Sequence, residues 1–225
     1  MLAQSWNTCL LQEVGAAVGY EMALFGVSLW LAPGMNIHRS PLCGRNFEYF
    51  SEDPLLSGQM AAAITRGVQS CPGCGVTLKH FACNNQETER LESNSLVSER
   101  ALREIYLRGF QIAVQSAQPS AIMTSYNLVN GVHAANSAAL CTAIVRCEWG
   151  FAGIFMTDWD TTSSRRCTAE GCIQAGNDLL MPGSRREYSA LLCALRDGRL
   201  DRRLLRSCAG RIIKTALGLS APTAP

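Results

Sequence analysis

The sequence predicts an α/β protein with a mostly parallel sheet that helices cover on both faces. Short apolar runs alternate with helical patterns along all 225 residues, and a helical pattern precedes each of five such runs. Strands that are buried on both faces give continuous apolar runs of this kind. Glycine stands directly before three of the runs, at Gly26, Gly75 and Gly153, where a helix commonly ends. A chain of this length can bury a substantial core.

The first half of the chain contains two helical patterns and two strand patterns. Asp53 and Pro54 are an N-cap and a first-turn proline, so a helix begins there. Apolar runs at 26–32 and 75–78 are the two expected strands. The two helical stripes recur every four residues and consist of Leu10, Val14, Val18 and Met22, and of Leu56, Met60, Ile64 and Val68.

The second half repeats the alternation. Ser98 and Ser137 are expected to begin helices, and strands are expected at 121–126, 153–158 and 178–181. The apolar residues of the three helical stripes are Leu102, Ile105, Gly109 and Ile112, then Leu140 and Ile144, and finally Leu204, Leu205, Cys208 and Ile212. The tail from Ser220 to Pro225 resembles a linker or a frayed end.

The charge of the chain favours no particular partner. Twenty basic and eighteen acidic residues give a net charge of +2. Arginines gather between 185 and 211, but Asp197 and Asp201 interrupt them and no aromatic residues are interleaved, so a solvated helix face is expected and nucleic-acid binding is not. The first thirty residues hold no basic start followed by an uninterrupted apolar stretch. We therefore expect no signal peptide, no membrane span and a cytoplasmic protein.

Eleven cysteines are many, but the number is odd and the chain is not short. Several fall in helical patterns, where free cysteine behaves as a small apolar residue, so a reduced setting is expected rather than a disulfide framework. Cys71 and Cys74 form the only close C-x-x-C pair, and no second pair stands at zinc-site spacing. A cysteine-bearing turn is therefore expected there, with no metal and no cofactor.

The segment GIFMTDW at 153–159 is the most informative part of the sequence. A buried strand exposes only its end, so Asp158 is expected at the carboxyl edge of the sheet, where parallel α/β folds place their chemistry. Trp159 offers a flat apolar face for a sugar ring or a similar ligand. The alternative is that Asp158 is merely the N-cap of a following helix, and the segment alone does not distinguish the two.

Polar side chains follow the other strands as well, and the carboxyl ends of parallel strands converge. The loop 40–54 is long, polar and aromatic, so it is expected to be functional, with Arg45 directed at a ligand. Alternatives remain for single residues: an ion pair of Arg45 with Glu48 or Glu52, a salt bridge for the lysine, and a core position for the imidazole. The residues at the successive strand ends are His38 and Arg39, Lys79 and His80, Tyr126 and Asn127, and Asp158 and Trp159.

Several motifs in the same order closely resemble glycoside hydrolase family 3, the β-glucosidase family. They are LAPGMNI at 31–37, RSP at 39–41, GRNFE at 44–48, SEDP at 51–54, KHF at 79–81, NNQE at 84–87, MTSYN at 123–127 and TDW at 157–159. The resemblance runs to about residue 217. It implies that residues 1–217 are most of the family's N-terminal (β/α)8 TIM-type barrel, with 218–225 as a linker or tail.

The resemblance also implies roles for single residues. Asp158 is implied as the catalytic nucleophile of a retaining glycosidase that hydrolyses terminal β-D-glucosyl or related β-glycosyl residues. Arg45, Lys79, His80 and Tyr126 would then line the subsite for the non-reducing sugar, and Trp159 would form a wall. Positive charge lowers the pKa of a nearby carboxylate, so Arg45 and Lys79 are expected to help keep Asp158 ionised.

The match also departs from the family pattern. The family's first strand, with its Asp-Gly-Pro-type motif, has no counterpart here, so the barrel is expected to be incomplete. The family's general acid usually comes from a second domain, which we expect to lie on another part of the protein or on a second chain. Asp160 stands where many relatives have glycine, and residues 161–170 match poorly.

Three other interpretations remain at this point. The chain is a catalytically inactive fragment that only binds sugar, or it is one chain of a split enzyme. A Schiff-base aldolase is the third, since a lysine at a barrel strand end is typical of that chemistry, but the motifs argue against it.

Overall fold

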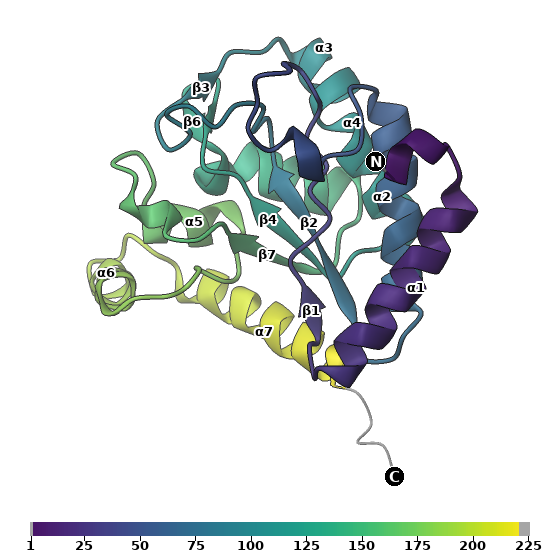
Figure 1. The fold of residues 1–225 in the computed structure, drawn as a ribbon. Coiled ribbons are helices and arrows are strands. Elements are labelled where there is room, and N and C mark those ends of the chain that lie inside the picture. The colour runs from purple at the N-terminus through teal and green to yellow at the C-terminus, as the bar shows by residue number, and fades with distance from the viewer. Residues whose placement is uncertain (1, 221–225) are drawn as a thin grey trace.

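The computed structural model describes residues 2–220, which form an α/β fold around one parallel sheet (Figure 1). The sheet contains β1 (Leu29–Trp30), β2 (Gly75–Phe81), β4 (Ala121–Thr124) and β7 (Ile154–Thr157), in that order. All three strand pairs are parallel. The α/β fold class and four of the five expected strands are therefore confirmed, and the sheet is an open, incomplete TIM-type barrel.

The expected strand at 178–181 is wrong as a strand. Its pairing with the sheet is one parallel bridge, between Met156 and Leu179. The Met181 N–H donates to the hydroxyl of Thr157 at 2.9 Å instead of to a backbone carbonyl. Pro182 then has no N–H to donate. The ladder therefore stops after Leu179, and this segment and β1 are the two edges of the sheet.

Helices cover both faces of the sheet. On one face lie α1 (Thr8–Leu24), α2 (Pro54–Gln69), α4 (Arg108–Ala117) and the π-helical segment Ala139–Glu148. Strand residues such as Leu78, Ile122 and Phe155 point into the main core on that side. On the other face Ile212 of α7 (Arg202–Leu219) packs on Met123 and Met156. Figure 1 shows α7 on the opposite side of the sheet from α2 and α4.

The remaining elements are short and lie mainly at the carboxyl edge or beside α7. A second small sheet has the order β3-β5-β6. The bounds of these elements are β3 (Asn94–Ser95), β5 (Leu128–Val129), β6 (Val132–His133), α3 (Glu99–Ala101), α5 (Ala169–Ala175), α6 (Arg185–Arg196), a π-helical turn (Leu102–Tyr106) and the 3-10 turns Leu2–Ser5, Asn46–Glu48, Ala134–Asn136 and Thr161–Ser163.

The stripe expected for the first helix is only partly right, since Met22 is buried as predicted but Leu10 is not. Leu10 is 38% exposed, whereas Leu11 and Met22 are buried, together with Gly15 and Gly19. A Cβ on Gly15 would collide with the carbonyl of Ile64 in α2. The two helices therefore touch through their backbones, and glycine carries no apolar side chain that a hydrophobic pattern could register.

The second helix agrees with its prediction. The Asp53 carboxylate caps α2 by accepting from the N–H groups of Leu55 at 2.6 Å and Leu56 at 2.9 Å. Met60, Ile64 and Val68 are buried as expected.

The helix after Ser98 begins as expected, and Leu102, Gly109 and Ile112 of its predicted stripe are buried, but Ile105 is not. The Ser98 hydroxyl accepts from the N–H of Ala101 at 3.3 Å. Leu107 N–H reaches back five residues to the carbonyl of Leu102, at 2.8 Å. This π-turn rotates the following residues, so Ile105 is 40% exposed and Leu107 is buried in its place.

The C-terminal part adds three findings. Helix α7 continues through Leu219, so the first two residues of the expected tail 218–225 are helical, and 221–225 lie outside the described residues. The arginines between 185 and 206 are exposed, as predicted for a solvated face, while Arg211 bonds Asp178 at 2.7 Å. None of the helices within 2–220 combines the length and apolar character that crossing a membrane requires.

Prediction for the helix contact. Gly67→Ala puts a methyl group against the Gln12 carbonyl and the Gly15 backbone of α1. We expect a loss of about 1–3 kcal/mol in the free energy of unfolding, because this contact cannot be relieved by a flexible side chain. Urea denaturation measures it. The matched control is Gly210→Ala in α7, where a Cβ meets nothing within 4 Å, so helix propensity should stabilise it by about 0.5–1 kcal/mol. Equal effects of the two substitutions would contradict the backbone contact.

Candidate active site at the strand ends

Asp158 lies at the carboxyl end of β7 and is 6% exposed. Its N–H still bonds the sheet, at 3.2 Å from the carbonyl of Thr124, so its backbone is held by the strand register. Oδ1 of the carboxylate accepts from the N–H of Trp159 at 2.7 Å. Oδ2 is buried and has no hydrogen-bond partner among the described residues. One oxygen is thus held in place while the other remains free for a ligand.

The N-cap interpretation of Asp158 is wrong. The next helical turn is Thr161–Ser163, and its N-cap position is Asp160, whose φ of 54° is left-handed and whose side chain makes no capping bond. Asp158 contacts that turn only through its carbonyl, which accepts from the Thr161 hydroxyl at 2.8 Å. The carboxylate itself faces the site.

His80 lies on β2, with its imidazole beside the carboxylate of Asp158. Its Nε2 lies 3.7 Å from Oδ2 of Asp158, and the residue is 1% exposed. The side chain of Asn36 clamps its backbone, accepting from His80 N–H at 2.8 Å and donating to His80 C=O at 2.9 Å. The Tyr49 hydroxyl lies 3.5 Å from Nδ1. The imidazole is therefore a fixed neighbour of the free carboxylate oxygen.

Burial shifts the pKa of both His80 and Asp158 towards their neutral forms. It lowers the pKa of His80 well below 6.5, and the positive charges of Arg45, Lys79 and Arg90 lower it further. His80 is thus neutral near pH 7, and its contact with Asp158 is not a pair of opposite charges. Burial also raises the pKa of Asp158, and the nearby Trp159 N–H, the Tyr126 hydroxyl, Arg45 and Arg90 only partly oppose it.

The expectation for the charges around Asp158 is therefore half right. Arg45 does lower the pKa of Asp158, but the desolvation of the carboxylate is the larger effect. Lys79 is not among the main influences on that pKa. The ammonium of Lys79 instead faces Glu48, with Nζ 3.7 Å from Oε2. The second cation that favours the ionised carboxylate is Arg90.

Glu48 holds two of the predicted sugar-binding cations. Arg45 Nε donates to Oε1 of Glu48 at 2.5 Å, while Lys79 lies at the other oxygen. All three side chains are largely buried, with exposures of 16–21%. The alternative of an ion pair for Arg45 is thus present with Glu48 and not with Glu52, which is exposed. The pair does not exclude a ligand role, because both cations stay in the same polar cluster.

Tyr126 and Trp159 are joined at the edge of the site. The Tyr126 hydroxyl donates to the carbonyl of Trp159 at 2.7 Å. Arg90 places its guanidinium 4.6 Å from the centre of the Tyr126 ring and bonds Glu87 at 2.8 Å. The indole of Trp159 remains 48% exposed, so its face is available to a ligand.

The structure thus brings Asp158 and His80 into contact, sets Tyr126 and Trp159 beside them, and ties Arg45 to Lys79 through Glu48. Sequence reasoning missed Asn36, Glu48 and Arg90 as parts of the site. Glu48 stands in the same polar loop as Arg45, and its charge was considered only as an alternative for that residue. Arg90 lies in the polar stretch after β2, and nothing in its local pattern distinguishes it.

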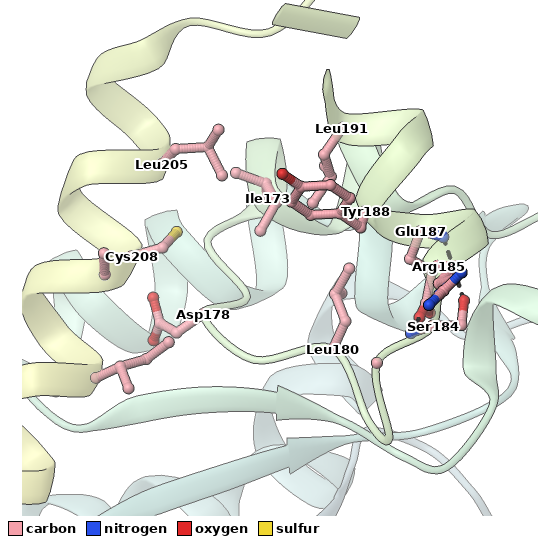
Figure 2. A pocket seen from close by; sticks show the side chains of 13 residues that line it. Ile173, Asp178, Leu180, Ser184, Arg185, Glu187, Tyr188, Leu191, Leu205 and Cys208 are labelled. Atoms are coloured by element: carbon pink, nitrogen blue, oxygen red, sulfur yellow. Dashed lines mark hydrogen bonds between the residues drawn. The ribbon is translucent and has the colours of Figure 1, made fainter. Parts of the chain in front are cut away.

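A separate cavity of about 510 Å³ lies between α5, α6 and α7, and Asp158 does not line it (Figure 2). Leu180, Leu191 and Leu205 make its wall largely apolar. The acidic side chain at its base, Asp178, is paired with Arg146 and Arg211 at 2.7 Å each. The cavity therefore does not extend the strand-end site. Within 2–220 there is also no cluster of three or more His, Cys, Asp or Glu residues that could hold a metal ion.

Comparison with known proteins places these features in a family. The sequence profile described as "Glycosyl hydrolase family 3 N terminal domain" matches residues 1–215. A "Beta-glucosidase" of Ruminococcus albus is 44% identical over 229 residues, covering 98% of this chain and 24% of that protein. An "Exo-alpha-(1->6)-L-arabinopyranosidase" of Bifidobacterium breve is 48% identical over 199 residues, covering 88% of this chain and 26% of that protein.

Solved structures agree with these relatives. Beta-glucosidase 3B from Thermotoga neapolitana, in complex with glucose, superposes with a TM-score of 0.92 at 47% identity, covering 96% of this chain and 31% of that one. A GH3 beta-glucosidase of Bifidobacterium adolescentis gives 0.89 at 43% identity, covering 99% and 33%. The chain therefore spans about a quarter of the length of the curated relatives it matches.

Prediction for the pH dependence of stability. The pKa of His80 is lowered on folding, so the unfolded state binds the proton more tightly than the folded state. Stability is then lost as the pH falls below about 6.5, the ordinary value for histidine. Urea denaturation of the wild type and His80→Gln at pH about 7 and about 5 measures this. We expect the variant to lose less of its unfolding free energy between the two pH values. If the wild type and His80→Gln lose the same unfolding free energy between the two pH values, the lowered pKa of His80 is contradicted.

Proposed function

Because this chain belongs to glycosyl hydrolase family 3, we propose that it carries the nucleophile half of a retaining β-glucosidase-like active site. The observation that supports this most directly is the carboxylate of Asp158, which is buried at a strand end with Oδ2 free of hydrogen-bond partners. A nucleophile needs one lone pair left unengaged and an orientation set by its surroundings. The Trp159 N–H supplies the orientation by holding Oδ1 at 2.7 Å.

The proposed reaction has two displacements at the anomeric carbon. Asp158 attacks it to form a covalent glycosyl ester while the leaving oxygen takes a proton from a general acid. Water then hydrolyses the ester from the same side that the leaving group occupied, so the configuration is retained. In retaining enzymes the two carboxyl groups stand about 5–5.5 Å apart.

The general acid is proposed to come from outside the described residues. Glu48 is engaged by Arg45 and Lys79, and Glu87 is paired with Arg90, so these two neighbouring carboxylates serve as partners of cations. A second domain or a second chain would supply the acid.

The remaining predicted residues have a consistent part in this proposal. Arg45 and Lys79 offer N–H donors to sugar hydroxyls, and these bonds accelerate the reaction where they tighten as the sugar becomes oxocarbenium-like. Neutral His80 at 3.7 Å from Oδ2 offers an N–H without adding a positive charge beside the developing cation. The exposed face of Trp159 suits the apolar side of a pyranose ring.

The proposed substrate is an oligosaccharide or glycoside with a terminal non-reducing β-D-glucosyl or related glycosyl residue. The names of the relatives cover both glucosidase and arabinopyranosidase activities. The sugar residues that these two activities would release are both terminal pyranosyl groups. The second candidate is a chain that binds sugar without turnover, and sugar-dependent stabilisation without covalent labelling would favour it.

The Schiff-base alternative for Lys79 is not favoured. That chemistry needs a neutral amine as the nucleophile. Here the side chain of Lys79 is paired with the carboxylate of Glu48, with Nζ 3.7 Å from Oε2.

Prediction for the nucleophile. A 2-deoxy-2-fluoro-β-glucoside with a dinitrophenyl leaving group needs no general acid, because that leaving group departs unprotonated. We expect intact-mass analysis to show one fluoroglucosyl adduct, and peptide mapping to place it on Asp158. Asp158→Asn should lower the labelling rate at least about 10³-fold, since a neutral amide is a poor nucleophile.

The matched control for this prediction is Asp160→Asn, two residues away, which should label like the wild type. A folded wild-type chain that acquires no adduct would overturn the proposed nucleophile. An adduct on another carboxylate would move the role to that residue.

Prediction for the carboxylate that holds the cations. Glu48→Gln removes the negative charge shared by Arg45 and Lys79. We expect the same labelling reaction to slow by about 10–100-fold, because both cations lose the partner that positions them at the sugar. Glu52→Gln is the matched control, since that side chain is exposed in the same loop. Equal labelling rates of the two variants would show that Glu48 has no positioning role.

A further inference from the structure

A pair of buried thiols lies beyond the candidate site, in the segment that leaves Asp158. The sulfur atoms of Cys167 and Cys172 are 3.5 Å apart, and the two residues are 4% and 0% exposed. A disulfide bond is about 2.0 Å long, so the sulfurs need to approach by about 1.5 Å to form one. Cys172 lies in the first turn of α5, and Cys167 precedes that helix in an irregular segment. The less regular residue is therefore the one that moves.

A buried histidine accompanies the pair. His133 is 2% exposed, and its Nδ1 accepts from the N–H of Ala135 at 3.2 Å. With Nδ1 as an acceptor, the ring proton of the neutral imidazole lies on Nε2. Nε2 is buried and has no hydrogen-bond partner among the described residues. The ring is close enough to Cys167 to lower the pKa of that thiol.

The two sulfurs are also chemically unequal. The pKa of Cys167 is lowered to about 6 by its hydrogen bond with Cys172 and by His133. The pKa of Cys172 is raised well above its ordinary value by the same bond and by burial. Asn136 holds the second sulfur in place, with Nδ2 at 3.1 Å from Sγ. The thiol with the lowered pKa, Cys167, lies between two exposed residues, Arg166 and Thr168.

We propose that Cys167 and Cys172 form a modification site, in which a peroxide oxidises the two thiols to a reversible intramolecular disulfide. The Cys167 thiolate attacks one oxygen of hydrogen peroxide, the O–O bond breaks, and the departing hydroxide takes a proton to leave as water. Cys167 is then a sulfenic acid. The Cys172 sulfur attacks the Cys167 sulfur, the S–O bond breaks, and the hydroxyl leaves with the Cys172 proton as a second water. The two thiols lose two electrons and the peroxide gains them.

The other close cysteine pair provides an internal comparison. Cys71 and Cys74 are only three residues apart, but each thiol donates to a carbonyl of α1: Cys71 to Ala16 at 3.6 Å and Cys74 to Gly19 at 3.4 Å. Burial and the neighbouring Cys71 raise the pKa of Cys74. Spacing along the sequence favours this pair, whereas the fold favours the pair at 167 and 172.

Tryptic peptides separate the two pairs. Trypsin releases residues 167–185 and residues 67–79 as peptides with two cysteines each. The folded chain is treated with hydrogen peroxide, quenched with catalase, denatured in N-ethylmaleimide and digested without reductant. We expect peptide 167–185 to lose two hydrogens and to escape alkylation at peroxide concentrations that leave peptide 67–79 doubly alkylated. Dithiothreitol before alkylation should restore both labels.

Variants and a denatured control complete the test. Cys167→Ser and Cys172→Ser should each abolish the disulfide, and Cys172→Ser should leave a sulfenic acid on Cys167 that dimedone traps. Cys71→Ser should leave oxidation of 167–185 unchanged. In denaturant the preference for the pair at 167 and 172 should vanish. The proposal is overturned if the folded wild type, checked by circular dichroism, closes the pair at 71 and 74 first or keeps both thiols of 167–185.

Discussion

The parallel register of β2, β4 and β7 is the constraint on which the candidate site depends. Thr124 pairs with Thr157 across β4 and β7, and Phe81 pairs with Thr124 across β2 and β4. His80 and Asp158 therefore emerge beside each other although 78 positions separate them in the numbering. The register of β2 against β4 shifts by one residue between Leu78 and Phe81, so the direction of His80 depends on this irregularity as well as on the strand pairing. The small residues at the helix contact let α1 approach α2 closely, and α2 in turn packs on β2.

The register places a carboxylate, an imidazole and several cations where water is largely excluded, and the low local polarity then determines their state. Burial favours the neutral forms of both Asp158 and His80. The cations work against burial at the carboxylate but with it at the imidazole, so the same charges that favour an ionised Asp158 keep His80 uncharged. Glu48 limits the effect by neutralising part of the charge of Arg45 and Lys79. The arrangement therefore places a neutral imidazole beside a carboxylate whose ionisation the nearby cations favour and burial opposes.

The sequence was sufficient for features that depend on local pattern, and insufficient for those that depend on contacts between distant segments. The strand end at Thr157–Asp158 follows from an apolar run that ends in a polar residue, and the cap of α2 follows from Asp53 and Pro54, whereas β2 continues through Phe81, past the end predicted at residue 78. The buried face of α1 could not be read fully from the sequence, because two glycines form part of it and carry no side chain that would register in a pattern. The failed strand at 178–181 looks apolar enough, but its one bridge to β7 is at Leu179, and the Met181 N–H donates to the side chain of Thr157. Arg90 lies over the ring of Tyr126, and no spacing in the sequence indicates that contact.

The segment after Asp158 connects the site to the rest of the fold in a way that limits where change is tolerated. The Asp158 carbonyl is held by Thr161, Ser164 bonds the carbonyl of Leu91, and Cys167 then meets Cys172 at the start of α5. Every anchor in this series belongs to the segment itself or to an element at the carboxyl edge. A change of length between Asp158 and Cys172 would therefore have to be absorbed at Asp158 or at α5, since β7 and the helix are both fixed by packing.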